Sequence, residues 1–461
     1  DGISIKLSAL HPRYEDAQLE RVLNELVPRV WQLCELAAAA NINLTIDAEE
    51  VDRLELSLAV FEALLTKIAQ QTPNWKGFGL AMQSYQTRAL ELIEHVAGLA
   101  RQYKVQLMCR LVKGAYWDAE IKRTQEMGLP HYPVFTHKHH TDISYLACAH
   151  AMLMAKDVMF PQFATHNAAT IAAIIQMASN NGAPFELQRL HGMGEGVYRE
   201  VLKNPTIRCR VYAPVGAHRD LLAYLVRRLL ENGANSSFVN NIVDENIPVE
   251  SLLKDPVETV RAWSKKRNNS IPLPHQLYGA ARLNSKGQDF TDIDQVTAMR
   301  AAMDTWLASV SQIEVPAGAF AVTNPANTKE VIGFHHHSNS AQMEQTVTNA
   351  EAAFPAWSAT PVTERALLLN KLADQLELHR DELLALCIKE AGKTVGDSMA
   401  EVREAVDFCR YYAARAEAMF KDHAADSRSC LTGTGIGELR AWHQVKPIRP
   451  AKQKPARIAP D

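Results

Sequence analysis

Short apolar segments alternate with longer amphipathic segments between residues 3 and 240, and this alternation restricts the fold more than any other feature of the sequence. The short segments, which are expected to be strands, are Ile3–Leu7, Leu44–Asp47, Phe78–Gln83, Gln106–Val112, Gln162–Thr165, Phe185–Leu190 and Arg208–Tyr212. Helices are expected after them, for example at Ser57–Ala69, Gln86–Gln102 and Ala168–Ser179. Such alternation predicts a parallel sheet whose strands are connected by helices.

The strands carry no glycine-rich nucleotide-binding motif, which favours a barrel over an open sheet. A (β/α)8 barrel needs eight strand-helix units, seven are recognisable, and the chain begins directly at a strand. The expected fold is therefore α/β, a (β/α)8 TIM-like barrel that lacks its first strand-helix unit. An open doubly wound sheet is the alternative.

Polar and aromatic side chains follow the expected strands. In barrels of this kind the chemistry takes place at the C-terminal ends of the strands. The residues there are Lys6, Ser8, Asp47, Glu49, Gln83, Tyr85, Arg110, Lys113, Tyr116, Trp117, Thr165, His166, Asn167, Gln188, His191 and Tyr212. One such residue alone is more often structural, but their presence at seven strand ends indicates an active site.

The composition excludes several other classes of protein. With 47% hydrophobic and 22% charged residues, the 461-residue chain has the profile of a soluble globular protein of two or three domains. Its net charge of -3 does not favour nucleic acid or an acidic membrane surface as a partner. The seven cysteines show no CxxC spacing, which predicts a reduced chain without a zinc site. The histidine groups His335–His337 and His137, His139 and His140 are expected to be surface residues, and no metal is expected.

Two adjacent arginines, Arg227 and Arg228, lie in a segment with helical spacing. Its apolar positions are Leu221, Leu222, Leu225, Val226, Leu229 and Leu230, and Gly233 is a plausible end of the helix. Adjacent arginines usually mark a solvated helix face. Alternatively, their planar guanidinium groups could bind a carboxylate. This segment alone leaves both interpretations open.

Four separated motifs occur in order along the chain, at Arg110–Trp117, Phe163–Asn167, Gln188–Glu195 and Tyr224–Asn235. Together they resemble the proline dehydrogenase domain of bacterial proline utilization A, over roughly residues 1–265. The resemblance implies an FAD-containing barrel that oxidises L-proline to Δ1-pyrroline-5-carboxylate and passes the electrons to a membrane quinone. It also implies that the last helix lies over the mouth of the barrel, which favours the carboxylate-binding interpretation of the two arginines.

The resemblance implies roles for individual residues. The expected catalytic residues are Arg110 beside the flavin N5 atom, Asp47 near the substrate nitrogen, and Tyr116. The residues expected to bind the substrate are Lys6, Arg227 and Arg228 at the carboxylate, and Tyr116, Leu190, Tyr212 and Tyr224 around the ring. The residues expected to bind FAD are Gln83, Arg110, Lys113, Gly114, Ala115, Trp117, Thr136, Lys138, Thr141, Thr165, His166, Asn167, Gln188, Glu231 and Ser237.

A second resemblance covers residues 316–420. A strand pair within Thr323–Ile332, four helices and the residues Pro355–Trp357, Arg365 and Glu390–Thr394 are similar to the opening of an aldehyde dehydrogenase domain. The helices are expected at Ala341–Trp357, Thr363–His379, Asp381–Ala391 and Ser398–Phe420. NAD is expected only for a complete domain of that kind. The predicted organisation is a barrel at 1–245, a linker at 246–315, this segment at 316–420, and an unmatched basic tail at 421–461.

The first resemblance further implies a cytoplasmic enzyme with peripheral contact at the inner membrane, and it is compatible with a homo-oligomer. DNA binding cannot be read from this chain. Two other functions stay open from the residues alone. One is a lyase or aldolase barrel that uses Lys6 or Lys113 as a Schiff-base amine, and the other is an inactive fragment.

Overall fold

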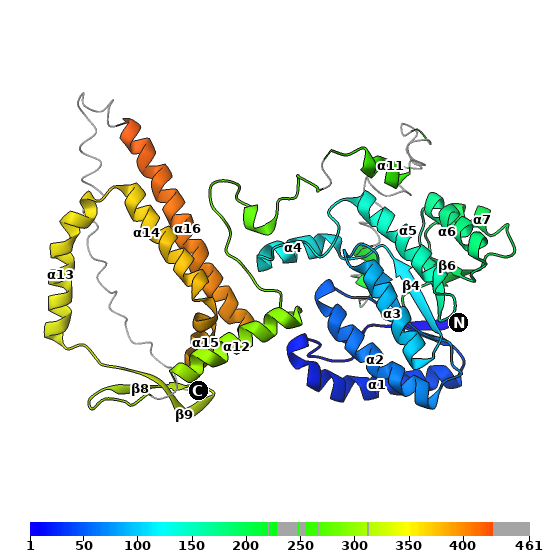
Figure 1. The fold of residues 1–461 in the computed structure, drawn as a ribbon, viewed down its shortest axis with the longest axis horizontal. Coiled ribbons are helices and arrows are strands. Elements are labelled where there is room, and N and C mark those ends of the chain that lie inside the picture. The colour runs from blue at the N-terminus through cyan, green and yellow to red at the C-terminus, as the bar shows by residue number, and fades with distance from the viewer. Residues whose placement is uncertain are drawn as a thin grey trace, which may run out of the picture. The chain divides into compact units, whose positions relative to one another are not determined.

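The computed structural model describes residues 1–219, 221–222, 224–227, 248, 255–264, 267–310 and 313–426. The chain divides into two compact units, Asp1–Trp306 and Leu307–Asp461. Figure 1 shows the strands and helices of both units along the chain.

The first unit is built on a seven-stranded sheet in which every neighbouring pair of strands is parallel. The strands are β1 Gly2–Ile5, β2 Asn43–Ile46, β3 Phe78–Gln83, β4 Leu107–Val112, β5 Met159–Ala164, β6 Glu186–Leu190 and β7 Cys209–Tyr212. All seven expected strands are therefore present. Their spatial order is their order in the chain, without the reversal of direction that defines a doubly wound sheet.

The sheet is curled, because side chains from distant strands meet inside it. Tyr212 of β7 donates a hydrogen bond to Asp47, which follows β2, over 3.1 Å. In a flat sheet, five strand spacings would separate these two strands by about 24 Å. The arrangement is that of a TIM-like α/β barrel wall, as the sequence predicts.

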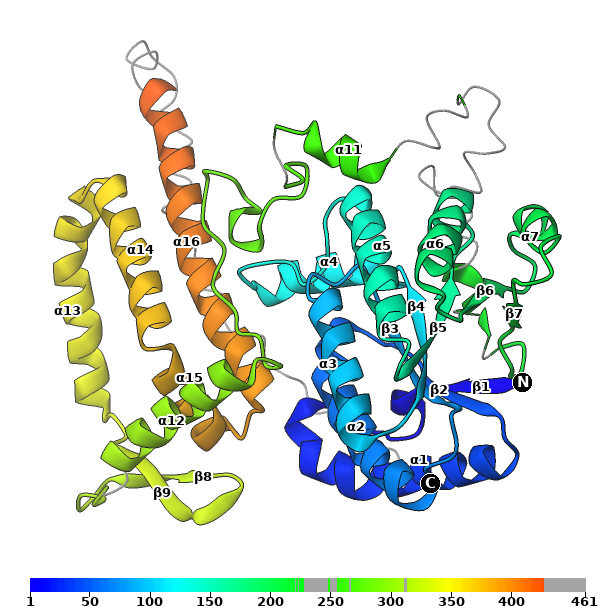
Figure 2. The ribbon, with the colours of Figure 1, turned by 45° about the vertical axis from the view of Figure 1, so that its right-hand side comes forward.

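Helices connect the strands and lie along the outside of the sheet (Figure 1, Figure 2). They are α1 Leu19–Ala39, α2 Leu54–Gln71, α3 Ala89–Tyr103, α4 Trp117–Met127, α5 Lys138–Met154, α6 Ala168–Asn181 and α7 Glu195–Val201. On α1, the fully buried residues Val22, Leu26, Val30 and Cys34 recur every fourth position, which is the spacing of one helix face. Such faces, together with the buried strands, form one continuous core.

Helix α3 begins at Ala89, three residues later than its amphipathic pattern predicts. Gln86 instead pairs with Val134 in an isolated bridge, and the amide of Thr87 donates to the carbonyl of Pro133 over 3.0 Å. Because residues 85–87 pair with this distant segment, the helix starts only after them. The helical periodicity therefore predicts the start of α3 three residues too early.

The described residues between 255 and 306 are part of the first unit and bond to its other segments, so a plain linker does not describe them. This part of the chain contains α11 Pro256–Arg261, a short helix η4 Pro274–Gln276, and α12 Ile293–Ser309. The side-chain amide of Asn268 donates to the carbonyl of Thr136 over 3.1 Å, and Tyr132 donates to the carbonyl of Pro272 over 2.7 Å. Proline and asparagine predict local turns correctly, but they do not reveal where such a segment docks.

The second unit contains an antiparallel pair, β8 Phe320–Asn324 and β9 Asn327–His335, followed by four helices. The helices are α13 Ser340–Ala359, α14 Val362–Leu378, α15 Arg380–Ala391 and α16 Val395–Asp426. The strand pair and all four helices are those expected. Asn339 and Gln342 form a reciprocal capping box that starts α13. Arg410 of α16 bonds to Glu377 and Asp374 of α14, over 3.1 Å to each.

Candidate active site

Arg110 of β4 is the centre of a hydrogen-bonded network inside the curled sheet. Its Nη1 donates to Asp47 Oδ1 over 2.6 Å, its Nη2 to Ser4 Oγ over 2.8 Å, and its Nε to Gln188 Oε1 over 2.7 Å. Its guanidinium carbon lies 4.9 Å from the centre of the Tyr212 ring. The side chain is only 10% exposed. Contacts to β1, β6 and the end of β2 thus hold this cation in one orientation.

Asp47 uses both carboxylate oxygens, one for Arg110 and the other for the hydroxyl of Tyr212. Burial raises the pKa of Tyr212 well above its ordinary value, and the charge of Asp47 raises it further. Tyr212 is therefore a neutral hydrogen-bond donor throughout the physiological range. Tyr224 lies close enough to contribute to the same pKa shift.

A second ion pair, between Glu186 and Arg210, holds the side chain of Gln188. Glu186, two residues earlier on β6, accepts from Gln188 Nε2 over 2.9 Å and from Gln162 Nε2 over 2.8 Å. Arg210 of β7 donates to both oxygens of Glu186, over 2.7 and 3.0 Å. Burial alone would raise the pKa of Glu186, but the hydrogen bonds from Arg210, Gln188 and Gln162 outweigh it and hold the pKa below its ordinary value.

Sequence reasoning missed these supporting residues, namely Ser4, Gln162, Glu186 and Arg210. A signal for two of them was present. Glu186 precedes Gln188 by two positions, and Arg210 precedes Tyr212 by two. Residues two apart on a strand share a face, so both could have been placed on the inner face of the sheet.

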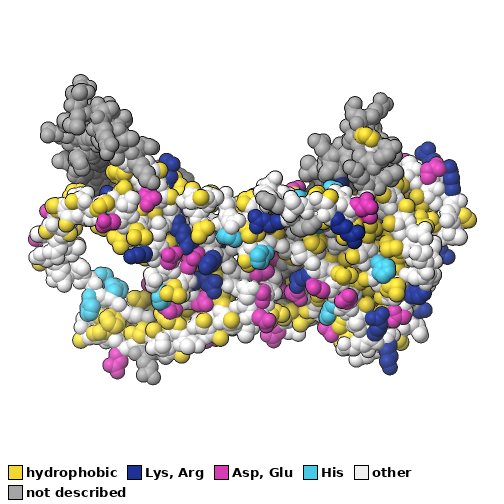
Figure 3. Space-filling view, turned by 45° about the horizontal axis from the view of Figure 1, so that its top comes forward, with side chains coloured by type: hydrophobic (Ala, Val, Ile, Leu, Met, Phe, Trp, Pro, Cys, Tyr) yellow, Lys and Arg dark blue, Asp and Glu magenta, His cyan; other side chains and the backbone are white. Residues whose placement is uncertain are grey.

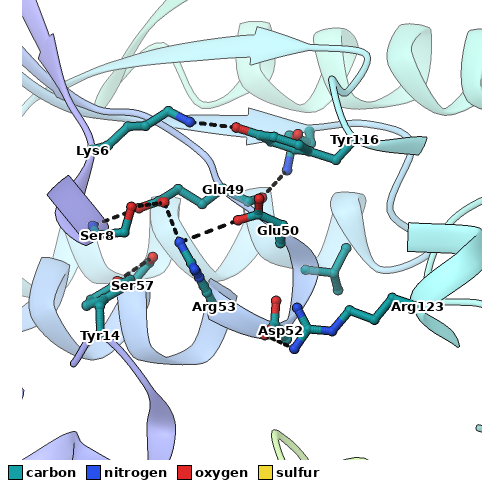
Figure 4. A network of polar contacts seen from close by, with 12 residues as sticks. Lys6, Ser8, Tyr14, Glu49, Glu50, Asp52, Arg53, Ser57, Tyr116 and Arg123 are labelled. Carbon is teal, nitrogen blue, oxygen red and sulfur yellow. Dashed lines mark hydrogen bonds and ion pairs between the residues drawn. The ribbon is translucent and has the colours of Figure 1, made fainter. Parts of the chain in front are cut away.

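Two of the three expected cations meet at Tyr116. The amine of Lys6 donates to the Tyr116 hydroxyl over 2.7 Å, as Figure 4 shows, and lies 5.4 Å from the centre of the ring. The guanidinium of Arg227 lies 5.5 Å from the same ring. Its Nε atom is buried and has no hydrogen-bond partner within the described part of the chain.

The helical segment that carries Arg227 is described only in part. Leu222, Leu225 and Val226 are exposed, so these three positions of the expected apolar face do not lie in the core. Arg227 itself is half-buried against Tyr116, which differs from a solvated helix face. Arg228, Glu231, Gly233 and Ser237 lie outside the described residues.

The loop after β2 is fixed by acidic side chains (Figure 4). Glu49 accepts from both the backbone and the hydroxyl of Ser8, and from Arg53 over 2.8 Å. The carbonyl of Glu49 accepts from Gln83 Nε2 over 2.8 Å. These bonds tie the loop that carries Asp47 to the ends of β1 and β3.

The loops after β3 and β4 pack around Tyr85. The amide of Tyr85 donates to the carbonyl of Lys113 over 2.7 Å, and its carbonyl accepts from the amide of Phe135 over 2.8 Å. Gly114 has a φ of 141°, and a Cβ on it would overlap the Tyr85 ring. The indole of Trp117 donates to the carbonyl of Phe135 over 2.8 Å. Bare backbone at Gly114 is thus needed for these loops to meet.

Lys113, Lys138 and Asp142 form a charged group at the start of α5. Lys113 pairs with Asp142. Burial lowers the pKa of Lys138, an effect that Lys113 adds to and Asp142 opposes. Thr141, one turn along the helix, is buried. A bound anion here would stabilise the charged form of Lys138, as a phosphate group does at a lysine.

The residues after β5 are held by β6 and α7. The hydroxyl of Tyr198 donates to the carbonyls of Thr165, over 2.7 Å, and Gln188, over 2.9 Å. The Nε2 atom of His166 accepts from the amide of Leu190 over 3.1 Å, so this nitrogen carries no proton. Asn167 caps α6 by accepting from the amide of Thr170. Each of these residues therefore has a structural partner that fixes its orientation.

The described residues contain no group of three or more His, Cys, Asp or Glu that could hold a metal ion. His137, His139 and His140 surround the ring of Trp263, with ring centres 4.5 to 5.7 Å apart. Basic and acidic side chains are interspersed on the face in Figure 3. None of the helices in the described ranges is long and apolar enough to cross a bilayer.

Several features fit a flavin. The side-chain amide oxygen of Gln162 and the hydroxyl of Ser84 are buried without a partner in the described chain. Arg110, which lies opposite Gln162 on the neighbouring strand, supplies a positive charge held in one orientation, and Lys138 lies at the start of α5. A planar heterocycle with a phosphate tail requires groups of these kinds.

Comparison with known proteins identifies two families. The proline dehydrogenase family matches residues 1–241, and the aldehyde dehydrogenase family matches residues 313–434. The bifunctional protein PutA of Salmonella typhimurium is 47% identical over 435 residues, which cover 89% of this chain and 33% of that protein. The chain thus spans about a third of the length of the curated relatives it matches. The 1-pyrroline-5-carboxylate dehydrogenase 2 of Bacillus subtilis is 35% identical over 105 residues, which cover 23% of this chain and 20% of that protein.

Solved structures give the same result. A crystal structure of bifunctional proline utilization A superposes with a TM-score of 0.80 at 46% identity, covering 90% of this chain and 40% of the other. Proline utilization A from Bdellovibrio bacteriovorus superposes with a TM-score of 0.79 at 29% identity, covering 90% and 43%. These matches give no support to the Schiff-base lyase alternative.

Proposed function

This chain belongs to the proline dehydrogenase family, and we propose that its first unit oxidises L-proline to Δ1-pyrroline-5-carboxylate with FAD as the hydride acceptor. The observation that carries the proposal is the convergence of Lys6 and Arg227 on Tyr116. The two cations can bind the carboxylate of a small amino acid, and the aromatic surface can pack against its apolar ring.

The proposed carboxylate site consists of Lys6, Arg227 and Arg228. Two cations facing one ring repel each other, and an anion between them would offset that repulsion. The buried, unpartnered Nε of Arg227 supports this role, because a carboxylate oxygen would accept a hydrogen bond from it. A bound carboxylate in turn determines which substrate carbon faces the flavin.

The proposed ring site consists of Tyr116, Tyr212, Tyr224 and Leu190. Aromatic faces pack an apolar five-membered ring and exclude water from it. We place the substrate nitrogen near Asp47. Both oxygens of Asp47 already accept hydrogen bonds, so we propose that it stabilises positive charge at the nitrogen and does not remove a proton.

The proposed flavin site lies over β3 to β6. Gln83, Lys113, Gly114, Ala115 and Trp117 would border the ring system and ribityl chain, together with Thr165, His166, Asn167 and Gln188. Thr136, Lys138 and Thr141, with Glu231 and Ser237, would hold the pyrophosphate and adenosine. The chemistry that FAD supplies when bound is the acceptance of a hydride. Arg110 would lie near N5, where its positive charge would favour the anionic reduced form of the ring system.

The destination of the electrons is part of the proposal. We propose a quinone acceptor and hence peripheral contact with the inner membrane from the cytoplasm, with a homo-oligomer as the assembly. NAD use belongs to a complete aldehyde dehydrogenase domain.

Reconstitution with FAD followed by a dye-reduction assay tests this function. The protein is expected to bind FAD and to reduce a quinone-like dye with L-proline, and to do so poorly with L-lactate. A protein that stays colourless after incubation with FAD would rule the proposal out.

A further inference from the structure

We propose that the ion pair between buried Glu186 and half-buried Arg210 positions Arg110 for flavin chemistry by fixing the orientation of the Gln188 side-chain amide. The inference rests on the proposed function, and it assigns Glu186 and Arg210 as positioning residues. Neither is expected to touch the substrate or the cofactor.

Glu186 is built into the inner face of the sheet as an acceptor. Its side chain is 7% exposed and receives four hydrogen bonds from three side chains. Arg210 provides two of them with Nε and Nη2, a bidentate geometry that keeps the carboxylate charged and immobile. The guanidinium also lies close to β1: if Gly2 carried a Cβ atom, the Nη1 of Arg210 would be 3.7 Å from it.

The carboxylate determines which way the amide of Gln188 points. An amide has a donor end and an acceptor end, and only its hydrogen-bond partners select between its two orientations. Because ionised Glu186 can only accept, it selects the Nε2 end of Gln188 at 2.9 Å. The Oε1 end must then face Arg110, whose Nε donates to it over 2.7 Å.

An uncharged residue at position 186 would remove the contribution of Glu186 to this selection and leave the Nε–H of Arg110 alone to orient the amide. A glutamine there can present its own NH2 group, so Gln188 could turn and direct a donor at the Nε–H of Arg110. Arg110 would then keep its bonds to Asp47 and Ser4 but lose its third anchor. A buried donor without an acceptor is unfavourable, so the guanidinium would no longer be held in one orientation.

The decisive variant is Glu186→Gln, which preserves the size of the side chain. With FAD bound, we expect proline-dependent flavin reduction to slow by about tenfold or more, with a KM for proline close to that of the wild type. The flavin should also become harder to reduce. Lys203→Met, which breaks the exposed ion pair of Lys203 with Glu200, is the matched control and should change none of these.

A double-variant cycle separates positioning from general damage. If Glu186 acts through Gln188, then Glu186→Gln should add almost nothing to the defect of Gln188→Ala. If the fold-losses of the flavin-reduction rate in the two single variants multiply in the double variant, the inference is overturned. It is also overturned if Glu186→Gln reduces its flavin at the wild-type rate. If Glu186→Gln fails to fold, Arg210→Lys replaces it and should give a smaller loss of the same kind, whereas unchanged flavin reduction in it would count against the pair.

A crystal structure of Glu186→Gln without cofactor gives a readout that is independent of activity. We expect the Nε atom of Arg110 to lie beyond hydrogen-bonding distance of the Gln188 side-chain amide, and a guanidinium that keeps its wild-type position would contradict the inference. If the wild-type protein itself fails to bind FAD or respond to proline, the proposed function fails instead, and this crystallographic test of the amide still stands.

Discussion

Arg227 and Lys6 reach the ring of Tyr116 from segments that are far apart in the chain. Adjacent arginines on an amphipathic segment usually face solvent, yet Arg227 is half-buried over the Tyr116 ring. Lys6, from the end of β1, reaches the same ring. Spacing along the segment could not reveal this contact, because Tyr116 is distant in sequence.

Replacing Arg227 with methionine should weaken proline binding while leaving the flavin in place. Loss of a charged hydrogen-bonding partner costs about 1.5–3 kcal/mol, which corresponds to a rise of about tenfold to a hundredfold in KM. Pyrrolidine, which lacks the carboxylate, should be affected far less. Arg21→Met, in an exposed pair with Glu25, is the control. A KM for proline that stays at the wild-type value would mean that Arg227 does not bind the carboxylate.

Gly114 should tolerate no side chain. Its φ of 141° makes Gly114→Ala strained, and the added Cβ would overlap the Tyr85 ring. We expect a loss of about 1–3 kcal/mol in the free energy of unfolding, together with reduced flavin content. Gly182 has a φ of 64° with open space around it, so Gly182→Ala should cost about 1 kcal/mol and leave flavin content unchanged. Equal effects of the two changes in denaturation and flavin absorbance would refute the crowding argument.

At the scale of elements, the strands of the first unit could be predicted because each is a short apolar run between helical patterns. The position of the segment at 255–306 could not be predicted, because it depends on single contacts such as the hydrogen bond of Asn268 with the carbonyl of Thr136. Charged groups within strands were also missed. A buried carboxylate such as Glu186 is unfavourable without a partner, and Arg210, on the neighbouring strand, supplies that partner.

The short helix η2 Asp16–Gln18, before α1, should make stability depend on pH. Burial, with repulsion from Asp52, raises the pKa of Asp16 from 3.8 to about 6. The folded state therefore favours the protonated form, so this stabilisation is complete below the unfolded pKa and is lost as pH rises through about 6. Allowing for solvent screening, Asp16→Asn should stabilise the protein by about 1 kcal/mol at pH well above 6.

The matched control for this prediction is Asp157, whose pKa is lowered by its hydrogen bonds with Arg101. Its contribution has the opposite sign, since it is present above the unfolded pKa and lost as pH falls. Asp157→Asn should therefore not stabilise the protein at high pH. Urea unfolding at two pH values measures both variants, and an Asp16→Asn effect that is the same at both would contradict the assignment.

At the scale of the whole molecule, the two units match different families, and we expect only the first to be catalytically active. The second unit matches one fifth of the length of a 1-pyrroline-5-carboxylate dehydrogenase. Burial raises the pKa of Cys387, the reverse of what an activated nucleophile needs. We expect no NADH from glutamate semialdehyde and NAD with this chain, and formation of NADH above the rate of a boiled sample would disprove it.

The central claim, that the first unit transfers hydride from L-proline to a bound flavin, can be measured without any electron acceptor. The FAD-loaded protein is mixed anaerobically with L-proline, and the visible absorbance of the flavin is followed. We predict that the absorbance is lost in a saturable, proline-dependent reaction, and that pyrrolidine at the same concentration causes little loss. A flavin that binds but keeps its absorbance in saturating L-proline would contradict the claim.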